Sequence, residues 1–170
     1  SGSCNAAFGE FALTANTSGS YNTALGTSAL QSNTTAGNNT AVGYQSLYNN
    51  TTASNNDAFG RQSLYTNTTG DLNAAFGQNA LFSNTTGTNN AAFGINSGYS
   101  NTTGSYNVFF GKDALRSNTT ASNNTAVGYQ AGYSNTTGAS GTYIGYQAGY
   151  NTTGGFNVLI GKSAGYTLSS

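Results

Sequence analysis

Side chains that could support catalysis or metal binding are few in this sequence. It contains no histidine, and its carboxylates are Glu10, Asp57, Asp71 and Asp113. Acid–base catalysis and metal binding need such groups gathered at one place, whereas these four acids occupy different positions of a 17-residue repeat. Cys4, the single cysteine, lacks a histidine that could activate its thiol. We therefore expect a protein without enzymatic activity, cofactor or metal ion.

Known ligand-binding motifs are also missing. Glycines are frequent, but no Gly-Lys-Ser/Thr phosphate-binding loop accompanies them. The Asp-rich calcium-binding nonapeptide of other β-rolls does not occur either. One cysteine cannot build an internal disulfide framework, so we expect Cys4 to be a terminal thiol or an intermolecular link.

The motif that recurs most often is Asn-Thr-Thr followed by Gly or Ala, as in SNTTG at 83–87 and 134–138. Each copy is an Asn-x-Ser/Thr acceptor for N-linked sugar, and its threonines could carry O-linked sugar. We favour the alternative of a structural role, because asparagine tolerates left-handed backbone and hydrogen-bonds its own backbone in turns. In either case we expect this column to face solvent. The candidate glycosylation residues are Asn16, Asn33, Asn50, Asn67, Asn84, Asn101, Asn118, Asn135, Asn151, Thr34, Thr51, Thr68, Thr85, Thr102, Thr119, Thr136 and Thr152.

The spacing of the glycines indicates that the whole chain is one array of repeats. One glycine recurs in every repeat at intervals of 17 residues, with one interval of 16 near the end. Such a fixed period is typical of a solenoid and argues against a disordered low-complexity tract. We predict a single repeat domain over residues 1–170. Its turns are marked by Gly9, Gly26, Gly43, Gly60, Gly77, Gly94, Gly111, Gly128, Gly145 and Gly161.

The residues around each glycine predict the course of one turn. The three residues before it alternate with the period of two that is typical of a strand, and a second asparagine column, from Asn5 to Asn157, precedes them. The glycine permits a corner, and a second short strand is predicted after it. The large residue before each glycine is predicted to form a buried core ladder: Phe8, Leu25, Val42, Phe59, Phe76, Phe93, Phe110, Val127, Ile144 and Ile160. The second strand ends in an aromatic column, interpreted as an outer stripe or a seam between chains: Tyr48, Tyr65, Phe82, Tyr99, Tyr133, Tyr150 and Tyr166.

These patterns predict an all-β protein, a parallel β-solenoid of about ten turns of 17 residues. Turns stacked at about 4.8 Å place like residues in ladders, so like charges would repel. Only 5% of the residues are charged, against roughly 25% in ordinary globular proteins. The formal net charge of zero gives no reason to expect binding to nucleic acid or an anionic membrane. No apolar run approaches the roughly 20 residues of a membrane span.

Two stretches, NTAVGYQSL (39–47) and NTAVGYQAG (124–132), resemble repeats of phage tail fibres and bacterial tail-fibre-domain surface proteins. Those repeats are in turn similar to the YadA-like head repeat of trimeric autotransporter adhesins. In this chain, TAVG (40–43 and 125–128) and FNVLIG (156–161) match the strand of that head repeat. The resemblance spans essentially the whole chain. It implies a left-handed parallel β-roll, commonly trimeric, in an extracellular fibre or adhesin. The 17-residue turn and the Asn-Thr-Thr insertion depart from the family pattern.

Ser1 and Ser170 lie at the same point of the repeat. Unpaired strand edges invite another chain, so we expect either head-to-tail assembly, with Ser1–Gly9 of one copy against Ala164–Ser170 of the next, or a fragment of a longer repeat tract.

Three functional interpretations remain open. The leading one is a non-enzymatic, self-associating shaft of an extracellular fibre or adhesin, located at a cell surface or on a virion. The second is a surface fibril whose Asn-Thr-Thr column carries sugar. The third is ice binding, although adjacent threonines on a strand point in opposite directions and do not form a flat two-file face. The expected partner is the protein itself, as a filament or trimer, and glycans or a host surface receptor are further candidates.

Overall fold

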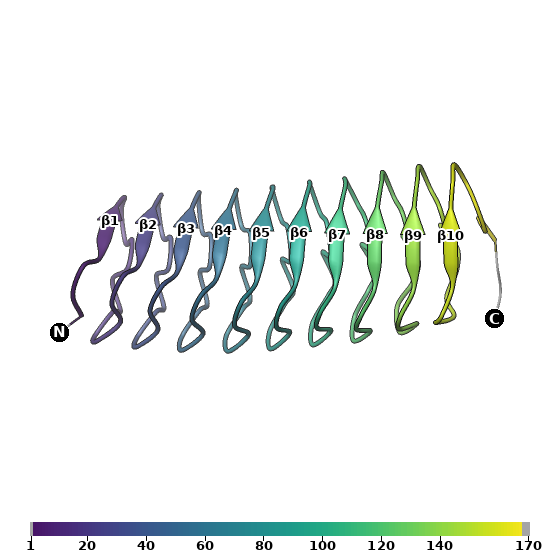
Figure 1. The fold of residues 1–170 in the computed structure, drawn as a ribbon. Coiled ribbons are helices and arrows are strands. Elements are labelled where there is room, and N and C mark those ends of the chain that lie inside the picture. The colour runs from purple at the N-terminus through teal and green to yellow at the C-terminus, as the bar shows by residue number, and fades with distance from the viewer. Residues whose placement is uncertain (1, 168–170) are drawn as a thin grey trace.

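The three residues before each corner glycine form a strand in the computed structural model, which describes residues 2–167. The ten strands in these residues lie side by side in chain order and form one parallel sheet (Figure 1). Each strand pairs in register with the next, as Ala75 does with Ala92. This confirms the predicted all-β parallel β-solenoid. The strands are β1 (Ala6–Phe8), β2 (Thr23–Leu25), β3 (Thr40–Val42), β4 (Asp57–Phe59), β5 (Ala74–Phe76), β6 (Ala91–Phe93), β7 (Val108–Phe110), β8 (Thr125–Val127), β9 (Thr142–Ile144) and β10 (Val158–Ile160).

The prediction of a second strand in each turn is wrong. After the corner, the chain has left-handed residues two and four positions past the glycine, such as Gln62 (φ 56°) and Leu64 (φ 50°). A left-handed residue at every second position is incompatible with an extended strand. The segment nevertheless bonds to the next turn, because the N–H of Leu64 donates to the carbonyl of Ala80 at 3.0 Å, and that of Thr66 to the carbonyl of Phe82 at 3.1 Å. Both walls of the coil are therefore joined from turn to turn.

The interior is lined by the middle residue of each strand and by the residue four positions past the corner glycine. In one turn these are Ala58 and Leu64, both fully buried. A short side chain on one wall therefore faces a long side chain on the other, which allows the walls to approach closely. The same pairing recurs as Ala24 with Leu30, Ala41 with Leu47 and Ala75 with Leu81.

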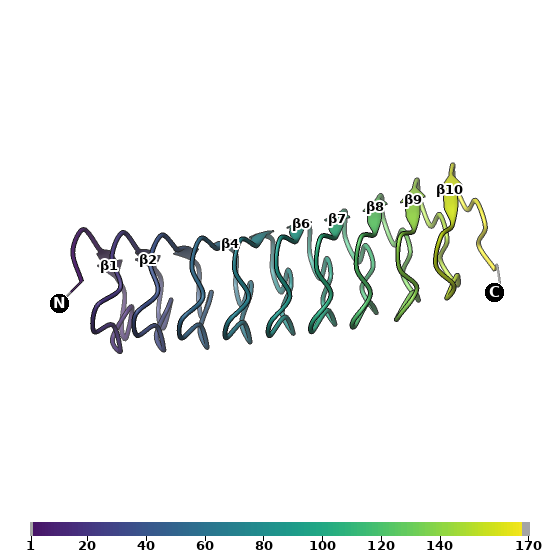
Figure 2. The ribbon, with the colours of Figure 1, turned by 60° about the horizontal axis from the view of Figure 1, so that its bottom comes forward.

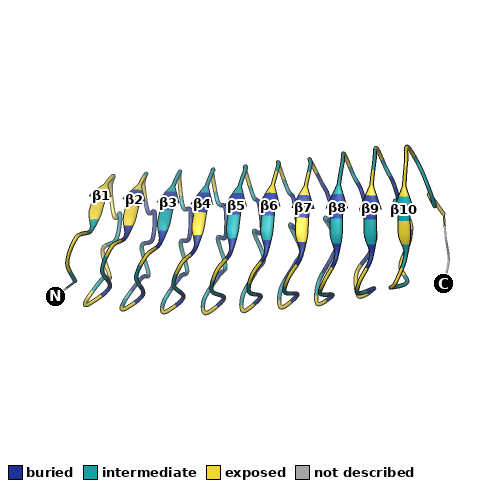
Figure 3. Ribbon diagram, viewed as in Figure 1, coloured by how far each residue is buried: buried dark blue, intermediate teal, exposed yellow. Residues whose placement is uncertain are grey.

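The prediction that the residue before each glycine is buried is wrong. Phe8 is 77% exposed and Phe110 is 54% exposed, and Figure 3 shows that in β2 to β9 a buried middle residue is flanked by half-buried or exposed ones. The period of two was correct, but its phase was not, because the narrow interior admits alanine more readily than phenylalanine. The outward residues are Phe8, Leu25, Val42, Phe59, Phe76, Phe93, Phe110, Val127, Ile144 and Ile160.

Large and small residues exchange places between the two walls in the later turns. Glycine replaces the core leucine at Gly98 and Gly132, and the larger Phe109 and Tyr143 replace the strand alanine in nearby turns. A Cβ at Gly98 would lie 3.0 Å from the Phe109 ring, and one at Gly132 would lie 2.9 Å from the Tyr143 ring. The aromatic rings thus fill the volume that the missing leucines leave, so the interior volume is conserved along the coil.

The corner glycines are required by both conformation and space. Gly77 has a φ of 142°, and a Cβ at this position would lie 2.5 Å from the carbonyl oxygen of Gly94 in the next turn. A side chain here would therefore separate neighbouring turns.

The sheet twists along the coil axis. In Figure 2 the first strands are seen nearly edge-on, whereas β8, β9 and β10 are seen face-on. Such rotation between neighbouring strands is general for β-sheets. The left-handed sense of the coil is a separate property and stays a prediction.

Leu64→Ala should lower the free energy of unfolding by about 2–5 kcal/mol, because it leaves a cavity between the walls. Phe76→Ala should cost clearly less, because Phe76 points outward and is only half-buried. Urea unfolding monitored by circular dichroism compares the two variants. If Phe76→Ala lowered the free energy of unfolding more than Leu64→Ala does, the residue before each glycine would be the buried core residue after all.

Candidate functional site

The asparagines of the Asn-Thr-Thr motif lie inside the coil. We call Asn16, Asn33, Asn50, Asn67, Asn84, Asn101, Asn118 and Asn135 the first asparagine ladder; from Asn33 onward its members are fully buried. The Nδ2 of Asn84 donates to the Oδ1 of Asn67 at 2.8 Å and to the carbonyl of Gly87 at 3.0 Å. The same pair of bonds is made by every member of this ladder from Asn33 to Asn118.

This burial overturns the prediction that the asparagines face solvent. A side-chain amide has two N–H donors and needs two acceptors, and both acceptors lie in the interior. In the folded chain the Nδ2 atoms of Asn33 to Asn135 are therefore inaccessible to an enzyme that would attach sugar. Sequence reasoning missed this because Asn-Thr-Thr-Gly is also a common solvent-facing turn motif.

A second asparagine ladder, Asn5, Asn22, Asn39, Asn56, Asn73, Asn90, Asn107 and Asn124, runs beside the first. The N–H of Asn90 donates to the Oδ1 of Asn73 at 3.0 Å, and the Nδ2 of Asn73 donates to the carbonyl of Gly87 at 2.9 Å. Asn84 donates to the same Gly87 carbonyl, so the two ladders meet there. The constant six-residue separation of the two asparagines, as between Asn84 and Asn90, is the sequence signal that could have revealed this contact.

The two threonines of each motif behave differently. The hydroxyl of the first one donates to the carbonyl of the equivalent threonine in the next turn, as Thr68 does to Thr85 at 3.1 Å. The second threonine, such as Thr69 or Thr86, is exposed. Among the candidate glycosylation threonines, Thr34, Thr51, Thr68, Thr85, Thr102 and Thr119 use their hydroxyls in this ladder.

The shortened turn displaces the last asparagine. Asn151 is exposed, and Thr152 takes the buried position instead, since its N–H donates to the carbonyl of Gly149 as that of Asn135 does to Gly132. The prediction that Asn151 continues the asparagine column is therefore wrong, because the missing residue lies after it rather than before it. Thr152 bonds through its hydroxyl to the carbonyl of Gly165 at 3.0 Å.

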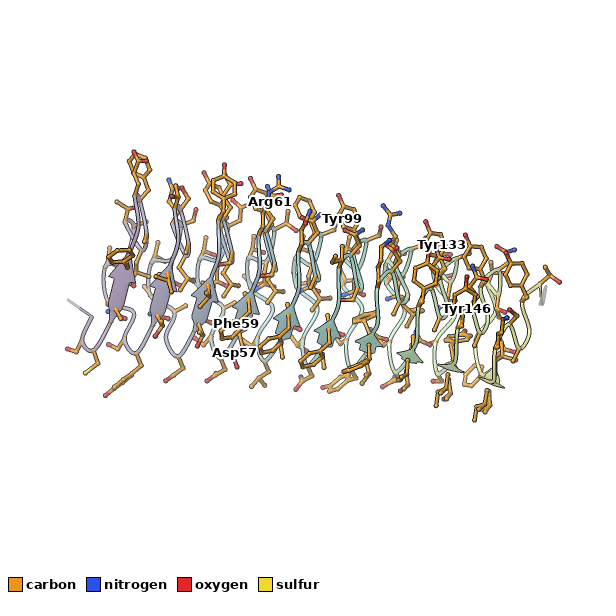
Figure 4. All side chains as sticks on the ribbon, turned by 90° about the horizontal axis from the view of Figure 1, so that it is seen from above. Asp57, Phe59, Arg61, Tyr99, Tyr133 and Tyr146 are labelled. Atoms are coloured by element: carbon orange, nitrogen blue, oxygen red, sulfur yellow. The ribbon has the colours of Figure 1, made fainter. Side chains whose placement is uncertain are left out.

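The aromatic column forms an outward stripe on the wall opposite the sheet. Figure 4 shows Tyr99 and Tyr133 on the side of the coil away from Asp57 and Phe59. The rings are stacked face to face, with centroids 5.1 Å apart between Phe82 and Tyr99. Whether the stripe is a seam between chains stays a prediction.

Arg116 replaces one ring of this stripe. Its guanidinium lies 5.1 Å from the Tyr99 ring centroid and 6.0 Å from that of Tyr133. Its Nε lies 3.5 Å from an Asp113 carboxylate oxygen. A planar cation can therefore continue an aromatic stack without a break.

The remaining titratable groups are not brought together. Glu10 and Asp57 are exposed in different turns, and an Asp71 oxygen accepts the N–H of Ser54. Within residues 2–167 there is no cluster of three potential metal ligands, no cavity, and no helix able to cross a membrane. Cys4 is exposed and free in this part of the chain.

Comparison of the chain with protein-family models, curated proteins and solved structures gave no match.

Tyr143 is a titratable side chain that is fully buried. Its hydroxyl occupies the space of the asparagine that Gly141 replaces, because a Cβ at Gly141 would lie 2.5 Å from it. Desolvation by burial raises the pKa of Tyr143, and the nearby Asn157 side chain partly offsets this rise.

Asn84→Asp should lower the free energy of unfolding by at least about 3 kcal/mol at neutral pH, because a buried carboxylate cannot donate to Asn67 or Gly87. Part of the loss should return on acidification, when the carboxyl is protonated. The matched control Thr86→Asp places the same charge at an exposed position of the same motif. Chemical denaturation of both variants tests this; equal stability at neutral pH would place Asn84 at the surface.

Raising the pH above about 10 should destabilise the fold through Tyr143, because the folded state holds the phenol proton more tightly than the unfolded state does. Below pH 10 this contribution is fully present. Tyr143→Phe should therefore lose less stability between about pH 8 and pH 11 than the parent protein or Tyr106→Phe, an exposed control. Thermal melts at both pH values decide; equal losses in all three proteins would contradict this role.

Proposed function

We propose that this protein is the shaft of an extracellular fibre or adhesin and that it assembles by self-association. The observation that carries the proposal is that successive turns repeat the same pattern of pairing and hydrogen bonds. Backbone pairing, both asparagine ladders and the threonine ladder all repeat in the same register. Any turn of one copy can therefore continue the ladders of another copy, as one turn continues the next within the chain.

In the 170-residue chain taken by itself, the end strands would offer the edges for this contact. Within the described residues, β1 pairs only with β2, and β10 pairs only with β9. An unpaired parallel edge is stabilised by a strand of matching register. Because the contact joins different surfaces of two copies, it does not close and produces a filament.

The charges on the end turns favour this joint. Glu10 and Lys162 both follow a corner glycine and are exposed. Residues one turn apart in this column are close neighbours, since the Nζ of Lys162 lies 6.0 Å from the Tyr146 ring centroid. Stacking β1 of one copy on β10 of another therefore brings Glu10 beside Lys162. In the interior, Leu13 of one copy would stack on Gly165 of the other, in the column of residues four positions past each corner glycine.

The non-enzymatic and extracellular parts of the proposal rest on the sequence. The scattered acids and the absence of histidine argue for a structural role. The surface location follows from the resemblance of the NTAVGYQ repeats to fibre proteins. Of the predicted end contact, Ser1 and Leu168–Ser170 lie outside the described residues.

Electron microscopy of the purified 170-residue chain should show filaments of one-coil thickness or more. Glu10→Lys and Lys162→Glu should each shorten them several-fold, because each places like charges at the joint. The double variant Glu10→Lys with Lys162→Glu restores opposite charges and should restore length. Filaments of unchanged length in both single variants, or single chains in the parent at all concentrations, would refute the end contact.

A further inference from the structure

The outward face of the ten-stranded sheet carries two files of side chains in the described residues. The high file is the residue before each corner glycine, from Phe8 to Ile160, and is always large and apolar. The low file is the residue two positions earlier, from Ala6 to Val158, and holds alanine, threonine and valine apart from Asp57. The files run about 6.6 Å apart, which is two residues of strand. We call both files together the sheet face.

The sheet face is apolar enough to need a cover. Six members of the high file are exposed in residues 2–167, and Phe110 is 54% exposed. With about 150–250 Å² for a whole large side chain, the exposed apolar side chains of the two files present roughly 700 Å². A typical monomer exposes patches of about 300–600 Å², and a stable pair buries about 600–1,000 Å² on each partner. The area therefore suffices for a stable interface.

The spacing of the files selects a second copy of this chain as the occupant. Phe59, Phe76 and Phe93 stack with centroids 4.7 and 4.8 Å apart. Side chains can interdigitate along ten turns only with a surface that has the same spacing between turns. A second copy of the chain necessarily has that spacing. A net charge of zero also means that two copies do not repel each other strongly.

A flat sugar polymer fits the face less well. Aromatic residues that bind sugar present the faces of their rings. Phe59, Phe76 and Phe93 stack face to face with interplanar angles of 7° and 2°, so their faces are covered and only their edges point outward.

We propose that two copies pack sheet face against sheet face with their coil axes parallel, related by a two-fold axis that runs along them. The strands of the two copies are then antiparallel, so the high file of each copy lies over the low file of the other. Antiparallel coil axes would instead place high file on high file and leave a gap between the low files. Each copy has one such face, so the assembly closes at two.

This arrangement also accommodates Asp57, the charged residue of the low file. Asp57 would lie opposite Phe59 of the second copy, whose exposed ring edge carries partial positive charge. Asp57 is exposed and has no ion-pair partner within residues 2–167, so its carboxylate is free for this contact.

Phe76→Glu and Phe82→Glu form a matched pair of test variants. Both residues belong to the same turn, both are half-buried, and both are stacked between two aromatic neighbours. Phe76 belongs to the sheet face, whereas Phe82 belongs to the aromatic stripe on the opposite wall. Phe76→Glu should weaken pairing at least about tenfold, because it buries a carboxylate one turn from Asp57 of the second copy, where it has no cation to pair with. Phe82→Glu should leave pairing intact.

The masses are measured by light scattering in the Glu10→Lys background, diluted until electron microscopy shows no filaments, and circular dichroism checks the fold. Two-chain particles for Glu10→Lys alone and for Phe82→Glu, with single chains for Phe76→Glu, are expected. Single chains for Glu10→Lys alone, pairing retained in Phe76→Glu, or loss of pairing in Phe82→Glu would overturn the sheet-face pair. Long filaments of Glu10→Lys would instead contradict the end contact proposed above, so the two failures are distinguishable.

Disulfide trapping tests the orientation and does not depend on Phe76→Glu folding. In a Cys4→Ser background, chains with Thr142→Cys are mixed with chains carrying Ile144→Cys, and separately with chains carrying Thr23→Cys. Parallel axes place Thr142 over Ile144 of the second copy, so only the first mixture should give a two-chain band on a non-reducing gel. Antiparallel axes place Thr142 over Thr23. A band in the second mixture, or in neither, would overturn the arrangement.

Discussion

The backbone hydrogen bonds between successive turns, 2.7–3.5 Å long, govern every other feature of this molecule. They hold turns one strand separation apart, so each residue has the equivalent residue of the next turn as its neighbour. A side chain is tolerated only if it is compatible with copies of itself. An amide carries both donor and acceptor, a hydroxyl can donate to the next carbonyl, and a ring can stack. The abundance of asparagine, threonine and tyrosine and the scarcity of charge follow from this constraint.

The asparagine ladders show how strictly this constraint fixes the register. Each amide finds its full set of partners only if the neighbouring turn carries asparagine at the same position. Near the end of the coil other residues take these positions, Gly141 in the second ladder and Thr152 in the first. Before them, in the described residues, the buried Asn118 Oδ1 and Asn124 Nδ2 have no partner, and Asn135 bonds locally to Gly138. The series of amide bonds that begins at Asn16 thus ends at Asn118. Buried amides stabilise this fold only as a continuous series.

The period of the repeat could be predicted from the sequence, whereas the side chains that point into the coil could not. The ladder constraint is visible as the spacing of glycine, so the parallel β-solenoid was correctly predicted. The phase was ambiguous because both Ala75 and Phe76 are apolar, and nothing local shows how narrow the interior is. The paired exchange at Gly98 and Phe109 is a long-range signal that could have identified the facing walls. Asn84 was misplaced because turn chemistry and ladder chemistry use the same residue type.

The twist of the sheet also sets the shape of the proposed sheet-face pair. Two straight rods could lie side by side, whereas two twisted ones must wind around their common axis to keep their faces in contact. Each coil then follows a helical path around that axis, while hydrogen bonds hold its turns at a nearly fixed spacing. Such a pair would be a two-stranded rope whose pitch is set by the rotation from each strand to the next.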